Sequence, residues 1–84
     1  MTDEEMLYRY AMRKGFRFTY SEDENFISIM VFTDKTDRIL SYTWDKTNEK
    51  ILYLRVDDKH YENVENALQD FDDYELLREN QSLY

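Results

Sequence analysis

The spacing of apolar residues changes twice along this 84-residue chain, and this change limits the fold more than any other feature. Near both ends apolar side chains recur every three or four positions, as in helices that bury one face. Between them the period is two, as in strands that bury one face. A run of strands between two helices predicts one α+β domain over residues 1–84.

The first helix is predicted at residues 3–14. Thr2 and Glu5 form a capping box, and acids at 3–5 with bases at 13–14 match the helix dipole. Gly15 is the only glycine, and it stands where a helix commonly ends on a left-handed residue. The face predicted to be buried holds Leu7, Tyr10 and Ala11.

Four strands are predicted at residues 16–20, 26–33, 38–44 and 50–56, joined as an antiparallel meander. Two similar segments, 34–37 and 45–48, lie eleven residues apart, and each begins Asp-Lys-Thr. Asp and Asn accept hydrogen bonds from nearby backbone N–H groups and tolerate positive φ. We therefore interpret both segments as hairpin turns.

A second helix is expected to begin with Asp57 or Asp58 as its cap. Its apolar positions are Tyr61, Val64, Ala67, Leu68 and Phe71. Beyond Asp72 and Asp73 the chain either continues this helix or starts a short separate one, and residues 79–84 are expected to fray.

Both helices are expected to cover one face of the sheet. That inner face is predicted to hold Phe18, Ile27, Ile29, Val31, Leu40, Tyr42, Trp44, Leu52 and Leu54. The opposite face would carry Met30, Phe32, Ile39, Ile51 and Tyr53, which is more apolar than a fully solvated face needs.

The net charge of −8 is concentrated at one end of the sequence. Residues 57–84 hold nine acids against two bases, Lys59 and Arg78. Nucleic-acid phosphates and anionic lipid headgroups would repel such a segment, so direct binding to nucleic acid or membrane is not expected. With no cysteine, no signal-peptide pattern and no apolar run of about 20 residues, the sequence predicts a cytoplasmic protein.

Motifs that would indicate an enzyme are missing from the sequence. It contains no glycine-rich phosphate loop, nucleophile elbow or paired-histidine metal spacing. The single histidine, His60, is expected at the surface or in the first turn of a helix. We therefore expect no catalysis, cofactor or metal site.

The acids near the carboxyl end suggest an imitation of a phosphate backbone. A continuous helix over residues 57–79 would be about 34 Å long and carry one carboxylate per about 4 Å. A DNA strand carries one phosphate per about 3.4 Å. Asp58, Glu62, Glu65 and Asp72 would share one face of that helix. The alternative is a solvated face that only confers solubility.

The first hypothesis is therefore an acidic, non-enzymatic inhibitor that mimics nucleic acid and blocks a basic DNA- or RNA-binding host protein. Its contact residues would be Asp58, Glu62, Glu65, Asp70, Asp72 and Asp73, with Tyr61 and Tyr74 as anchors. In charge, size and expected layout the chain resembles the small DNA-mimic inhibitors of bacteriophages and mobile elements. That resemblance implies a bacterial cytoplasm as the location and assigns no residue.

The second hypothesis is an interaction module, such as an immunity or adaptor protein, that binds through the apolar outer face of the sheet. Its interface would be Met30, Phe32, Ile51 and Tyr53, with methionine supplying adaptability. A homodimer would use the same face. The alternative is that a helix or the C-terminal tail covers this face.

Overall fold

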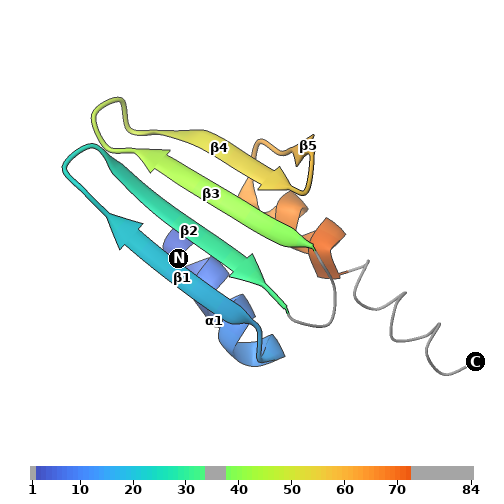
Figure 1. Cartoon of the computed structure of the whole chain (residues 1–84). Coiled ribbons are helices and arrows are strands. Elements are labelled where there is room, and N and C mark those ends of the chain that lie inside the picture. The colour runs from blue at the N-terminus through green and yellow to red at the C-terminus, as the bar shows by residue number, and fades with distance from the viewer. Residues whose placement is uncertain (1, 34–37, 73–84) are drawn as a thin grey trace, which may run out of the picture.

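A computed structural model describes residues 2–33 and 38–72 of the chain (Figure 1). The elements are α1 (Asp3–Lys14), β1 (Arg17–Glu22), β2 (Phe26–Phe32), β3 (Ile39–Asp45), β4 (Lys50–Val56) and β5 (Lys59–His60). A second helix follows, whose described part spans residues 64–72. The strands pair antiparallel in the order β1-β2-β3-β4-β5. The predicted α+β fold with two helices is confirmed, with five strands instead of four.

Helix α1 has the predicted ends. The backbone N–H of Glu5 donates to Thr2 Oγ1 at 3.2 Å, which caps the first turn. Gly15 lies in the left-handed region with φ 73°, where a side chain would be strained. The buried residues of α1 are Leu7, Tyr10 and Ala11, as predicted.

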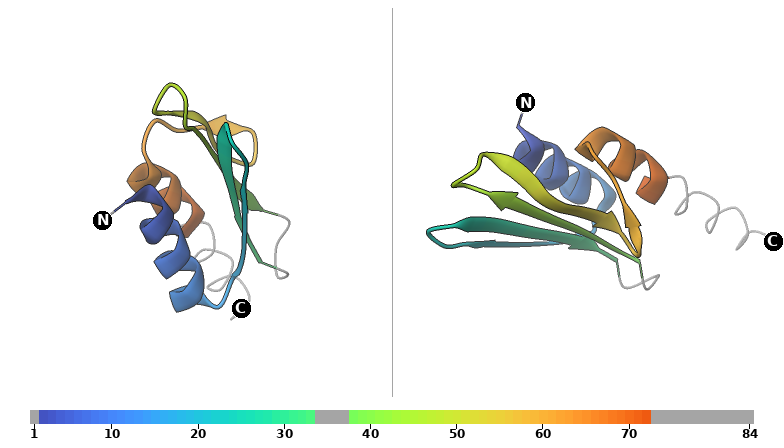
Figure 2. Two further views of the ribbon diagram at one scale, coloured as in Figure 1. Left: turned by 90° about the vertical axis from the view of Figure 1, so that its left-hand side faces the viewer. Right: turned by 90° about the horizontal axis from the view of Figure 1, so that it is seen from above.

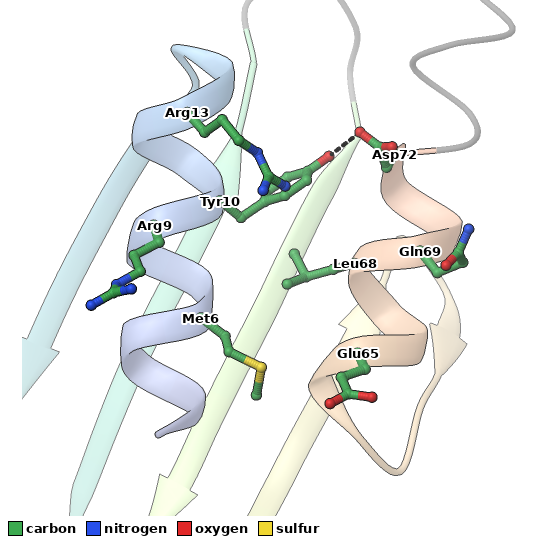
Figure 3. Close-up of a pocket in the computed structure, with 8 residues that line it drawn as sticks. All are labelled: Met6, Arg9, Tyr10, Arg13, Glu65, Leu68, Gln69 and Asp72. Atoms are coloured by element: carbon green, nitrogen blue, oxygen red, sulfur yellow. Dashed lines mark hydrogen bonds between the residues drawn. The ribbon is translucent and has the colours of Figure 1, made fainter. Parts of the chain in front are cut away.

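Both helices lie on the same face of the sheet and run side by side in the same direction (Figures 2 and 3). Phe71 of the second helix is fully buried, and its ring packs edge to face against Phe16 at 5.7 Å and Tyr10 at 6.1 Å between centroids. The sheet contributes the buried residues Ile27, Ile29, Val31, Leu40, Tyr42, Leu54 and Val56 to the same core.

The turn between β3 and β4 lies where it was predicted and uses Asp45 as a local acceptor, but its positive φ falls on Glu49 and not on an Asp or Asn. The Asp45 carboxylate accepts the backbone N–H groups of Thr47 and Asn48 at 3.0 and 3.1 Å, and Glu49 takes a positive φ of 53°. The matching turn predicted at 34–37 lies outside the described residues.

A β-bulge in β4 changes which side chains face the helices. Thr43 pairs with Tyr53, but the next residue, Trp44, pairs with Ile51, so Leu52 has no partner across the ladder. Ile51 consequently packs against the core, and Leu52 is 43% exposed. The predicted outer place of Ile51 was wrong, and Leu52 lies outside the core, because a strict period of two does not hold across a bulge.

The second helix begins later than predicted. Asp57, with φ 56°, occupies a tight turn into β5, and the N–H of Tyr61 donates to the Leu54 carbonyl at 2.8 Å. The cap is Asn63, whose Oδ1 accepts the N–H of Asn66 at 2.9 Å. Asp57, Asp58 and Asn63 are all good turn or cap residues, and strand pairing to β4 decided between them.

Candidate protein-binding surfaces

The continuous acidic helix predicted over residues 57–79 does not form in its first seven positions. Asp58 lies in the turn before β5 and Glu62 precedes the second helix, so neither shares a helical face with Glu65 and Asp72. The predicted row of evenly spaced carboxylates is therefore wrong for Asp58 and Glu62. Asp73 and Tyr74 lie outside the described residues.

Two acids of the segment 57–79, Asp57 and Asp70, both form ion pairs with Arg38. Arg38 Nε donates to Asp57 Oδ2 at 2.7 Å, and Arg38 Nη2 lies 3.3 Å from Asp70 Oδ2. The Arg38 side chain is only 12% exposed, and its guanidinium lies over the Phe71 ring, 5.8 Å from the centroid. Asp57 and Asp70 thus neutralise a cation of the same chain at the point where β3 begins.

Asp70 and Tyr61 also contact each other within the molecule. The Tyr61 hydroxyl donates to Asp70 Oδ2, and this bond, with the Arg38 charge, lowers the pKa of Asp70. Partial burial and the same bond raise the pKa of Tyr61 to about 12. The hydroxyl proposed as a partner anchor is therefore engaged inside the molecule.

Asp72 joins the two helices. Its Oδ1 lies 2.7 Å from Lys14 Nζ and accepts the Tyr10 hydroxyl at 3.2 Å (Figure 3). The contact with Lys14 lowers the pKa of Asp72. Asp58 in turn lies 3.6 Å from Arg55 Nη2, with its side chain fully exposed. Three of the five described acids proposed as contacts, Asp58, Asp70 and Asp72, are thus paired within the chain.

Unpaired acids gather instead where both helices begin. Because the helices run in parallel, the first turn of α1 and the start of the second helix lie at the same end of the helical layer (Figures 2 and 3). Within the described part of the chain, none of these acids makes an ion pair. We call this surface the acidic end; its residues are Asp3, Glu4, Glu5, Glu62 and Glu65.

A shallow groove of about 450 Å3 separates the two helices on their solvent side (Figure 3). Met6 and Leu68 line it between walls of opposite charge. Arg9 and Arg13 stand on the α1 wall, and Glu65 and Asp72 on the other. This groove therefore offers charges of both signs for docking.

The outer face of the sheet has no helix over it among the described residues (Figure 2). Met30 is 42% exposed, Ile39 42% and Tyr53 50%, while Phe32 is half-buried. The structure thus brings three of the four predicted interface residues together and adds Ile39. The fourth, Ile51, faces the core because of the bulge. Neither described helix crosses to this face, so that alternative is wrong, while the alternative in which the C-terminal tail covers it concerns residues outside the described ranges.

A hollow of about 610 Å3 lies in this face. Its lining residues are Met30, Ile39, Ser41, Thr43, Tyr53, Arg55, Asp57 and Asp58. Arg55 Nε is buried and has no hydrogen-bond partner among the described residues. A buried donor without an acceptor costs about 1–3 kcal/mol, so this guanidinium is incompletely satisfied. Sequence patterns gave no signal for it, because its environment comes from the neighbouring strands.

No described cluster of three His, Cys, Asp or Glu side chains is arranged to hold a metal ion. None of the described helices has the length and apolarity to cross a membrane.

Comparison with protein-family models, with curated proteins and with solved structures finds no match for this chain.

Proposed function

We propose that this protein acts by binding another protein, without catalysis, and that the outer face of the sheet is its principal binding surface. The observation that carries the proposal is the exposure of Met30, Ile39 and Tyr53 around one hollow, while both helices lie on the other face. Contiguous apolar surface of this kind is a mark of protein–protein contact.

The composition of the outer face supports this role. Its centre combines methionine and tyrosine, residue types enriched at protein interfaces, with Arg55 beside them. Arg17 and Asp58 lie toward its edges and supply a charged rim. An apolar centre within a polar rim excludes water from the contact, which increases the contribution of the buried residues.

A second candidate is the acidic inhibitor of a basic nucleic-acid-binding protein, of the kind encoded by phages and acting in bacterial cytoplasm. The specific observation in its favour is the acidic end, where Glu62 and Glu65 are exposed and unpaired among the described residues. The predicted phosphate-like row of carboxylates is interrupted, so this candidate is supported only by the concentration of negative charge at the acidic end.

Affinity capture from a bacterial lysate with mass spectrometry separates the two candidates. Baits would be the wild type, Met30→Asp, and the double variant Glu62→Lys with Glu65→Lys. Met12→Asp is the matched control, because Met12 is 52% exposed and lies on α1. We expect Met30→Asp alone to lose the partner, because a carboxylate at the centre of an apolar contact would be desolvated without a counter-charge.

The reverse result, with capture lost only in the double lysine variant and weakened between about 50 and 200 mM salt, would favour the acidic inhibitor. Capture that survives in all three variants would contradict both candidates. Circular dichroism of each bait confirms that it is folded.

A further inference from the structure

We propose that the outer face binds the outer face of a second copy of this chain, so that two molecules pack sheet against sheet about a two-fold axis. This inference rests on the proposed function, because it names the partner of the same surface. Three properties of the outer face support this dimer: its charges, its polar groups and its area.

Charge selects the outer face for self-association. Two copies of a chain with net charge −8 repel each other wherever unpaired acids would meet. Arg17 and Arg55 stand at strand positions that point to the outer face. The one described carboxylate at such a position is Asp45, and it already accepts hydrogen bonds from backbone N–H groups of its own turn. At the rim, Asp57 and Asp58 contact Arg38 and Arg55.

The acidic end belongs to the helical layer, on the other side of the sheet (Figure 2). A face-to-face dimer therefore keeps these unpaired carboxylates away from the contact. The same arrangement would leave two acidic ends exposed, one on each copy.

The polar groups of the outer face are suited to pairing with themselves. Ser28, Ser41 and Thr43 point outward between the apolar side chains, and a hydroxyl both donates and accepts hydrogen bonds. Arg55, whose side chain is 39% exposed, adds guanidinium donors. A two-fold axis places the same patch on both sides, so a patch with donors and acceptors of its own is self-complementary.

The available area fits a weak dimer. Four strands about 4.8 Å apart and about seven residues long at about 3.3 Å each present roughly 440 Å2 per copy. A contact of roughly 900 Å2 in total is near the lower limit of specific interfaces. We expect a dissociation constant of about 1–100 µM, so that dilution separates the copies.

Sedimentation equilibrium of the full chain over about 1–300 µM tests the proposal, since this range brackets the expected dissociation constant. We expect the mass to rise from 10.4 kDa toward twice that value. Met30→Asp should weaken the dimer at least tenfold, because it opposes two carboxylates across the axis, and Met12→Asp should leave it unchanged. Raising salt from about 50 to 200 mM should strengthen the dimer by screening the repulsion.

The double variant with Glu62→Lys and Glu65→Lys should dimerise at least as well as the wild type, because it changes the net charge from −8 to −4. A wild type that stays monomeric to about 300 µM would overturn the dimer, as that lies beyond the expected range. So would a dimer that Met30→Asp leaves intact. If a monomeric wild type captures a different protein that Met30→Asp fails to capture, the dimer is wrong while the binding role of the outer face stands.

Discussion

The two faces of this sheet come from the same strands, and both carry large apolar side chains, yet among the described residues only one face has a helical layer over it. On the inner face Ile29, Val31 and Leu40 are fully buried beneath α1 and the second helix. On the outer face Met30 and Ile39, their immediate neighbours in sequence, stay more than 40% exposed. This difference in exposure between neighbouring residues is the reason for proposing that a partner covers the outer face.

The largest expected effect comes from removing the aromatic ring at the centre of the inner layer. Phe71→Ala should destabilise the protein by about 3–5 kcal/mol, because it leaves a cavity among Tyr10, Phe16 and the sheet. Tyr53→Ala, the matched aromatic on the outer face, should cost less than about 1 kcal/mol in the monomer. Urea unfolding at low protein concentration measures both, and equal losses would contradict the contrast between the faces.

A smaller change in stability is expected at the β-bulge in β4, which determines whether Ile51 or Leu52 packs against the core. Ile51→Ala should destabilise by about 1–2 kcal/mol, since Ile51 is partly buried against the core. Leu52→Ala should change stability by less than about 0.5 kcal/mol, since Leu52 is exposed. Strict alternation predicts the opposite order, so thermal or urea unfolding of this pair decides which register holds.

The smallest effect concerns the ion pair that joins the two helices. Lys14 lowers the pKa of Asp72 in the folded protein, so the pair contributes stability above the carboxyl's usual pKa of about 3.9 and loses it as the pH falls through the folded value. Asp72→Asn should therefore cost about 0.2–1 kcal/mol near neutral pH.

The difference between wild type and Asp72→Asn should shrink as the pH falls below about 4. Urea titrations between about pH 7 and pH 2 measure it, because this range spans the carboxyl transitions. Lys14→Gln should reduce the difference to the part that the Tyr10 hydroxyl contributes. A difference that grows toward low pH would show that the pKa of Asp72 is raised in the folded state.

Local patterns predicted the first helix and the alternation of β2, because the signals for these elements lie within a few residues. Thr2 and Gly15 mark the ends of α1, and Ile27, Ile29 and Val31 mark the buried side of β2. The start of the second helix was not predictable in the same way. Asp57 and Asn63 are both good residues for a turn or a cap, and the pairing of β5 with β4 decides between them.

The two candidate surfaces also differ in how far the sequence alone predicted them. Three of the four proposed sheet-face residues lie together, because alternation alone places Met30, Phe32 and Tyr53 on one side. For the acidic segment, the sequence supplied the number of carboxylates but not their partners. Asp70 and Asp72 approach Arg38 and Lys14, residues 32 and 58 positions away, only once the helices pack on the sheet.

What the sequence by itself determined is the order of the elements, the net charge and the excess of apolar residues over what one buried face requires, because these follow from residue type and short-range spacing. The tertiary structure decided which carboxylates are paired, which residues of β4 reach the core and which sheet face has no described helix over it. Those outcomes depend on contacts between segments far apart in the chain, and no local pattern encodes such contacts.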